Sequence, residues 1–150
     1  MRRGPAAVRR RGGRVILVQH DGDAREGLAP HTPGRELLPG LDRRPEDVIV
    51  RKTLNDAFAG TTRARELAAA SVGTLAVTLW ATDYCVDSTI RSAVSRGFAV
   101  HVPSDAHTVS DRSHLKAGQI IEHHNRIWAG LIATPPVRVL PTKALLSESA

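Results

Sequence analysis

Apolar residues along this chain gather in short runs that alternate with amphipathic stretches. Four runs of five to eight residues are rich in Val, Ile and Leu and are bounded by Gly or polar residues, a pattern typical of buried strands. The runs predict strands at 14–18, 48–52, 73–80 and 98–103. Apolar residues at helical spacing predict helices at 61–71, 85–96 and 114–130.

Strands and helices of these lengths in alternation predict an α/β fold of three layers, a Rossmann-like parallel sheet with helices on both faces. The tail is expected to lie over the surface or to add an edge strand at 137–140. Ligands in such folds bind beyond the carboxyl ends of the strands. The side chains expected at those ends are His20, Asp21, Lys52, Trp80, Tyr84, Cys85, Asp105 and His107.

The 150 residues suffice for one domain with a sizeable core. We place that domain at 15–134, between a basic segment at 1–14 and a tail at 135–150. No apolar run approaches the roughly 20 residues of a membrane span, so no membrane partner is expected. A single cysteine excludes an intramolecular disulfide and fits a cytoplasmic protein.

The net charge of +6 belongs to the first segment rather than to the domain. Six of the 21 basic side chains lie in residues 1–14, which leaves 15 basic against 15 acidic side chains in the rest. The segment is interpreted as a nucleic-acid or anionic-surface arm, a targeting segment, or a first helix that is replaced or shortened. It is expected to be flexible or to be a remnant of that helix. No aromatic residue stands among its arginines to stack on bases, and no nucleic-acid partner is expected.

Cys85, the only cysteine, is expected at the amino terminus of the helix at 85–96, directly after a strand. The free N–H groups and the positive end of the helix dipole favour a thiolate there, and a thiolate is the nucleophilic form. Two other interpretations stay open. In one, Cys85 serves as a small buried apolar side chain; in the other, it is a redox-sensing thiol, for which the chain lacks a second cysteine.

The segment ATDYCVDSTIR at 81–91 resembles the nucleophile segment of the isochorismatase-like cysteine hydrolases. Further segments similar to that family lie on both sides of it, in the order that the family has them, at 15–23, 32–41, 48–61, 98–108 and 114–131. The resemblance implies an isochorismatase-like fold with Cys85 as the nucleophile and Lys52 as the catalytic lysine. It also implies an oxyanion hole made by the backbone N–H groups of Ala81 and Cys85, and a cis peptide bond between Trp80 and Ala81.

The sequence departs from the family in two places. Relatives have Gly and a small aliphatic residue where Leu79 and Trp80 stand here. The family's catalytic aspartate ends a strand that precedes the segment at 15–23, where this chain has only the Arg-rich segment, so we expect an amino-terminally shortened fold. The alternatives are a carboxylate supplied by Asp21 or Asp23, a misassigned start site, or a degenerate paralogue.

The resemblance implies a hydrolase that cleaves a small amide or related acyl substrate through a thioester at Cys85. The alternative is a catalytically impaired family member that acts in binding or oligomer assembly, and a homo-oligomer is expected. Nicotinamidases of this superfamily bind a divalent ion near the first strand end, but the His and Asp spacing here does not match, so no metal or other cofactor is expected. The pocket residues are expected to be Asp21, Phe58, Trp80, Tyr84 and His107.

Overall fold

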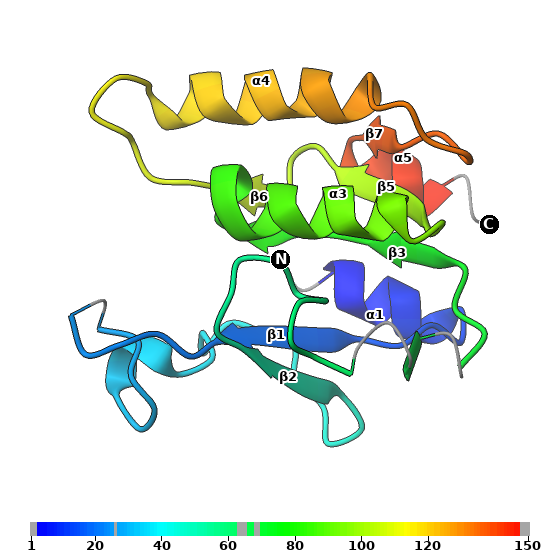
Figure 1. The fold of residues 1–150 in the computed structure, drawn as a ribbon. Coiled ribbons are helices and arrows are strands. Elements are labelled where there is room, and N and C mark those ends of the chain that lie inside the picture. Colours follow the sequence, from blue (N-terminus) through cyan, green and yellow to red (C-terminus); the bar gives the residue numbers. More distant parts are fainter. Residues whose placement is uncertain (1–2, 26, 63–65, 68–69, 148–150) are drawn as a thin grey trace. The chain divides into compact units, whose positions relative to one another are not determined.

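The computed structural model of this chain describes residues 3–25, 27–62, 66–67 and 70–147. Strands and helices alternate along these residues (Figure 1), which confirms the predicted α/β class. Contacts divide the chain into two compact units. The first consists of Met1–Leu54 with Ala59–Thr61, and the second of Asn55–Phe58 with Thr62–Ala150.

The first unit is built on a pair of parallel strands, β1 (Ile16–His20) and β2 (Val48–Lys52). The bounds of β2 are those predicted from its apolar run. β1 lies two residues further along the chain than the predicted strand at 14–18, because the ladder continues until His20 stands opposite Lys52. A short 3₁₀ turn, η1 (Pro33–Arg35), interrupts the long connection between the strands.

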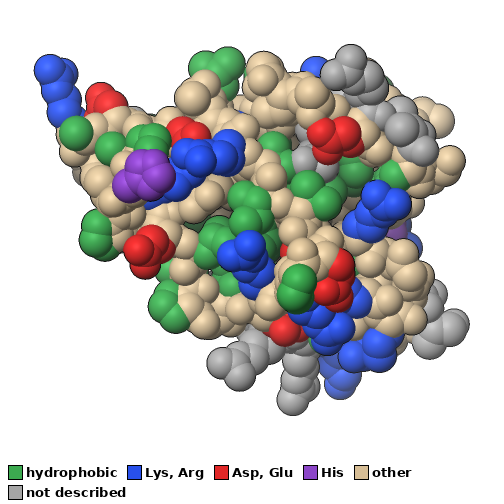
Figure 2. Space-filling view, turned by 90° about the horizontal axis from the view of Figure 1, so that it is seen from below, with side chains coloured by type: hydrophobic (Ala, Val, Ile, Leu, Met, Phe, Trp, Pro, Cys, Tyr) green, Lys and Arg blue, Asp and Glu red, His purple; other side chains and the backbone are tan. Residues whose placement is uncertain are grey.

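The Arg-rich segment is helical, as α1 (Arg3–Arg10), and is attached to the first unit through Arg9. The Arg9 guanidinium donates to the carboxylates of Asp42 and Asp47, and the Asp47 carboxylate also accepts the backbone N–H of Arg44 at 2.8 Å. Pairing of this kind recurs elsewhere on the molecule. Figure 2 shows a face on which Lys and Arg side chains are interspersed with Asp and Glu side chains.

The second unit holds a three-stranded parallel sheet in the order β3 (Thr74–Ala76), β5 (Ala99–Pro103), β7 (Arg138–Leu140). A separate parallel pair is formed by β4 (Leu79–Trp80) and β6 (His107–Thr108). β5 matches the strand predicted at 98–103, and β7 is the edge strand predicted in the tail.

The single strand predicted at 73–80 is wrong, because the chain bends within it and forms β3 and β4 with different partners. Leu79 has a φ of 88°, in the left-handed region that a leucine rarely adopts, so the extended run cannot continue straight through it. The backbone N–H of Val77 still bonds to His101 of β5, whereas that of Leu79 bonds to Ala106 before β6. The bend therefore places Trp80 in the separate pair formed by β4 and β6.

The described residues of the second unit form the helices α3 (Asp87–Ser95), α4 (Ala117–Ala129) and α5 (Thr142–Ser147). α3 contacts β5, and α4 contacts β7. The predicted helix at 114–130 begins at Ala117, since the Asp111 carboxylate accepts the Ala117 N–H at 2.9 Å. The helix predicted at 61–71 is helical at residues 66–67, and several of its other residues lie outside the described ranges.

α3 ends in a Schellman motif that requires Gly97. The N–H of Gly97 bonds to Val94 at 2.9 Å, and that of Phe98 bonds to Ala93 at 3.1 Å. This geometry places Gly97 at a φ of 81°, which glycine adopts without a steric penalty. The motif turns the chain sharply into β5.

The core of the second unit is formed by apolar side chains that face one another across the sheet and helices. Its most deeply buried members are Ile90, Ala93, Val100, Val102 and Trp128. Among the described residues, no helix has both the length and the apolar character that a membrane span requires.

Candidate active site

Cys85 lies in a tight turn, η2 (Thr82–Val86), between β4 and α3. The peptide bond between Trp80 and Ala81 is cis, as the resemblance implied. The Ala81 carbonyl then accepts the N–H groups of Tyr84 at 3.2 Å and Val86 at 3.0 Å. The second of these bonds makes η2 a π-helical turn, so the regular helix predicted from residue 85 starts only at Asp87.

The partly exposed Cys85 thiol contacts a side chain that the sequence did not single out. Its Sγ lies 3.7 Å from Asn55 Oδ1. A carboxamide can accept from a thiol through its oxygen and donate to a thiolate through its nitrogen. Asn55 lies within VRKTLNDAF, the segment that carried the resemblance around Lys52, so that motif could have indicated it.

The residues that follow Asn55 are attached to α3. The Ser92 hydroxyl donates to Asp56 at 2.8 Å, and the backbone N–H of Ala57 donates to the Thr89 hydroxyl at 3.1 Å. Phe58, a predicted pocket residue, is buried and stacks on Phe98 with ring centroids 5.9 Å apart. These contacts hold Asn55 beside the helix that follows Cys85.

Two predicted pocket residues, Trp80 at the end of β4 and Tyr84 in η2, have exposed aromatic rings. Trp80 exposes 55% of its surface and Tyr84 51%. The Arg112 guanidinium lies over the Tyr84 ring, 4.7 Å from its centroid, and donates two hydrogen bonds of 2.8 Å to Asp83. Those hydrogen bonds hold the pKa of Asp83 below its ordinary value, so η2 presents a carboxylate to Arg112.

His107 lies in the interior of the second unit, with 5% of its surface exposed. One ring nitrogen, Nδ1, is 3.0 Å from the Thr82 hydroxyl, and the other, Nε2, is 3.0 Å from Asn125 Oδ1. Burial holds the pKa of His107 below its ordinary value. The structure thus brings this predicted pocket residue to the inner side of η2.

Lys52 and Asp21 are at neighbouring strand ends of the first unit, as predicted. The Asp21 N–H bonds to the Lys52 carbonyl at 2.7 Å, and the buried Lys52 ammonium donates to the Leu54 carbonyl at 2.8 Å. Asp21 accepts from Arg51 at 2.8 and 3.0 Å and from Arg35 at 2.6 Å. The hydrogen bond from Arg51, then that from Arg35, holds the pKa of Asp21 below its ordinary value, which makes this carboxylate a weak base.

Other roles named from the sequence stay predictions. These are the oxyanion hole at Ala81 and Cys85 and the action of Lys52 on the thiolate. The second aspartate considered as a substitute base, Asp23, accepts the N–H of Arg25 at 2.8 Å within a turn. No group of three or more His, Cys, Asp or Glu side chains in the described part of the chain is arranged to hold a metal ion.

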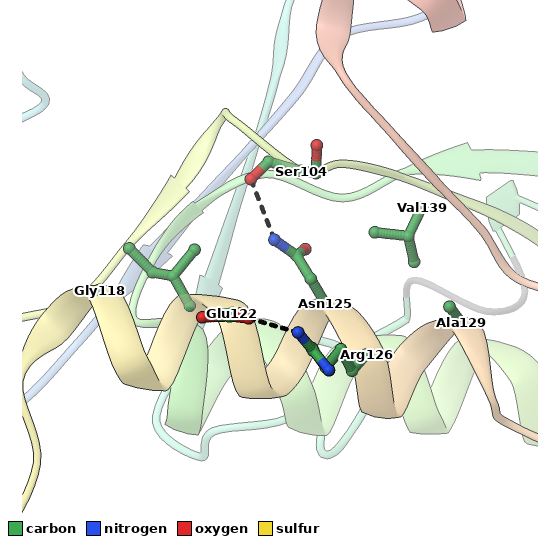
Figure 3. Close-up of a pocket in the computed structure, with 8 residues that line it drawn as sticks. Ser104, Gly118, Glu122, Asn125, Arg126, Ala129 and Val139 are labelled. Atoms are coloured by element: carbon green, nitrogen blue, oxygen red, sulfur yellow. Dashed lines mark hydrogen bonds and ion pairs between the residues drawn. The ribbon is translucent and has the colours of Figure 1, made fainter.

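A groove of about 420 Å³ lies along α4, and none of its lining residues was predicted as a site residue. Figure 3 shows the ion pair between Glu122 and Arg126 on the helix and the hydrogen bond between Asn125 and Ser104. The groove is lined by Ser104, Gly118, Ile121, Glu122, Asn125, Arg126, Ala129 and Val139.

Comparison with known proteins decides the family. The model of the isochorismatase domain matches residues 3–124, well over half of the chain. This chain belongs to the isochorismatase family. The match includes α1, so the family's sequence pattern extends over the Arg-rich segment that we had set apart from the domain.

Relatives in the isochorismatase family include a streptothricin hydrolase of Streptomyces noursei. It is 41% identical over 104 residues, which cover 69% of this chain but only 41% of that protein. One solved structure of an isochorismatase family protein has a TM-score of 0.81 at 33% identity, over 90% of this chain and 77% of that one. A cysteine hydrolase from Pseudomonas syringae has a TM-score of 0.82 at 26% identity, over 96% and 76%.

These relatives confirm the isochorismatase-like fold and the predicted resemblance. Proteins named as hydrolases are among the matches, namely the streptothricin hydrolase and the cysteine hydrolase from Pseudomonas syringae. The chain spans about two fifths of the length of the streptothricin hydrolase that it matches.

Proposed function

We propose that this isochorismatase-family protein is a cysteine hydrolase that cleaves a small amide or related acyl compound in the cytoplasm. The observation that carries the proposal is the placement of Cys85. Its thiol lies in a tight turn ahead of α3, partly exposed and 3.7 Å from the Asn55 carboxamide. Streptothricin hydrolase and the Pseudomonas cysteine hydrolase support the reaction class.

In the proposed reaction, the Cys85 thiolate attacks the substrate carbonyl carbon and forms a C–S bond. The carbonyl oxygen takes up the electron pair and is stabilised by the backbone N–H groups of Ala81 and Cys85. The C–N bond then breaks, and the amine leaves with the proton given up by the thiol. Water hydrolyses the thioester to a carboxylic acid and returns a proton to the sulfur.

Lys52 is proposed to support the thiolate electrostatically. Only two residues lie between Lys52 and Asn55, whose side chain contacts the thiol. Asp21 is a poor candidate for the base, because two arginines already hold it as a carboxylate. The substrate is proposed to contact two exposed rings, that of Trp80 before the turn and that of Tyr84 within it.

The test is the pH dependence of Cys85 alkylation by iodoacetamide, in the wild type and in Lys52→Ala. We expect half-maximal reactivity at a lower pH than for a free cysteine, and an upward shift of that midpoint in Lys52→Ala. Lys143→Ala, which removes a lysine of α5, is the matched control, and Cys85→Ser gives the blank. A folded wild type whose cysteine reacts like a free thiol would contradict the proposal.

The second candidate is an assembly protein without hydrolase activity, for which the sheet edges are the relevant observation. Within the described ranges, β1 pairs with β2 alone and β3 with β5 alone, and a second copy could cover such edges. We therefore propose a homo-oligomer in either case. A homo-oligomer by light scattering, together with an ordinary Cys85, would favour this second function.

A further inference from the structure

Four polar groups form a continuous hydrogen-bonded row behind the turn that carries Cys85. Thr82 of η2 bonds to His107 of β6, and His107 bonds to Asn125 of α4, each at 3.0 Å. Asn125 Nδ2 in turn donates to the Ser104 carbonyl at 3.2 Å (Figure 3). All four belong to the second unit, so the row links the nucleophile turn to β6, α4 and the segment after β5.

The direction of each bond follows from the one at the Ser104 carbonyl. That carbonyl can only accept, so the Asn125 amide nitrogen faces it and the amide oxygen faces His107. The imidazole must then donate from Nε2, which leaves a lone pair on Nδ1 to accept from the Thr82 hydroxyl. The row thus defines one tautomer of a neutral His107.

These hydrogen bonds are costly to lose because Thr82 and His107 are buried. Thr82 is fully buried, and the His107 ring packs edge-on against Trp128 with centroids 5.0 Å apart. Water therefore cannot replace a lost partner, and a buried group without one is costly. Burial also holds the pKa of His107 below its ordinary value, in agreement with the neutral form.

We propose that His107 is a positioning residue for Cys85 and acts through its hydrogen bond to Thr82. Thr82 begins η2, and its carbonyl also accepts the N–H of Asp87, so holding Thr82 holds both ends of the turn in which Cys85 lies. The proposal rests on the proposed function, because it assigns the turn a nucleophile to position. His107 does not touch the substrate in this role.

Two pairs of variants separate the bond to Thr82 from the rest of the row. In His107→Asn, a carboxamide oxygen can take the place of Nδ1 and keep the bond to Thr82. In His107→Gln, the longer side chain reaches the place of Nε2 instead, so it keeps the hydrogen bond to Asn125 and loses the hydrogen bond to Thr82. Thr82→Ser retains the hydroxyl, and Thr82→Val removes it at similar volume.

The measurement is the rate constant of Cys85 alkylation at pH 7 and its pH midpoint, in variants shown to be folded by circular dichroism. His107→Gln and Thr82→Val are expected to slow alkylation about five-fold or more and to raise the midpoint, because less thiolate is held in the turn. His107→Asn and Thr82→Ser are expected to stay within about two-fold of the wild type. His123→Gln, at an exposed histidine of α4, is the control.

Equal reactivity within both pairs would overturn the positioning role. A wild-type Cys85 that reacts like a free cysteine would instead overturn the proposed function, so the two failures are distinguishable. If His107→Gln or Thr82→Val does not fold, the proposal is tested by ¹⁵N NMR of the wild-type protein, which identifies the tautomer of the His107 imidazole. The Nε2–H tautomer supports the proposal, and an Nδ1–H tautomer overturns it.

Discussion

The two tryptophans differ completely in environment. Trp128 is fully buried, and its indole N–H donates to Asp87 at 2.8 Å, which connects α4 to the first turn of α3. Trp80 is more than half exposed at the end of β4. Because Asp87 follows η2 directly, Trp128 is a structural support of the turn that carries Cys85, whereas the Trp80 side chain is exposed.

We predict that Trp128→Phe lowers the free energy of unfolding by about 2 kcal/mol, because it removes a hydrogen bond to a charged group and part of a buried ring. Trp80→Phe is the matched control and should change the stability by less than about 0.5 kcal/mol. Urea unfolding followed by circular dichroism measures both. Equal losses in the two variants would show that the contact between Trp128 and Asp87 contributes little.

At the scale of elements, α1 shows how an arginine-rich segment becomes part of a fold. An arm for an external partner is one of three interpretations of its charge, but the Arg9 guanidinium pairs with Asp42 and Asp47 from the connection before β2. Asp47 is buried and depends on this partner. A buried carboxylate that loses its cation is strongly destabilising, so Arg9 attaches the helix to the first unit.

Arg9→Met is therefore expected to loosen α1 and the segment around Asp47, whereas Arg10→Met, at an exposed position of the same helix, is expected to change neither. Amide hydrogen exchange measures this directly. Faster exchange over residues 3–10 and 42–50 should occur in Arg9→Met alone. Identical protection in the two variants would contradict the anchoring role.

At the scale of the whole molecule, the buried neutral His107 makes the stability of the fold depend on pH. Its pKa is lowered by burial, with His124 acting in the same direction and Asp105 and Asn125 against it. The unfolded chain therefore binds a proton more readily than the folded one. The stability that comes from a neutral His107 is fully present above the ordinary histidine pKa of about 6.5. It is lost as the pH falls from there through the pKa that His107 has in the folded chain.

We predict that the free energy of unfolding declines between pH 7 and pH 5, and that the decline is smaller in His107→Asn. Asp83 and Asp105 have pKa values lowered by hydrogen bonds, so their contributions are lost only at lower pH, below the ordinary carboxyl value of about 3.8. Urea unfolding at a series of pH values separates the two windows. If the free energy of unfolding of His107→Asn declined between pH 7 and pH 5 as steeply as that of the wild type, His107 would be ruled out as the source of the decline.

Features that depend on neighbouring residues could be predicted from the sequence. The apolar runs at 48–52 and 98–103 predicted β2 and β5, because a strand needs only a short apolar segment with polar limits. The motif around Cys85 predicted the isochorismatase family and the cis bond before Ala81. The order of strands and helices was sufficient for the fold class.

Features that depend on residues distant along the chain could not be predicted in this way, because they arise only when the chain has folded. The bend at Leu79 follows from pairing with two different strands, which no apolar pattern encodes. His107 fitted a pocket wall by its place after a strand, yet it lies inside because its partners come from η2 and α4. Hydrogen bonds between such distant side chains form only when packing brings them together, and that packing is a property of the folded chain.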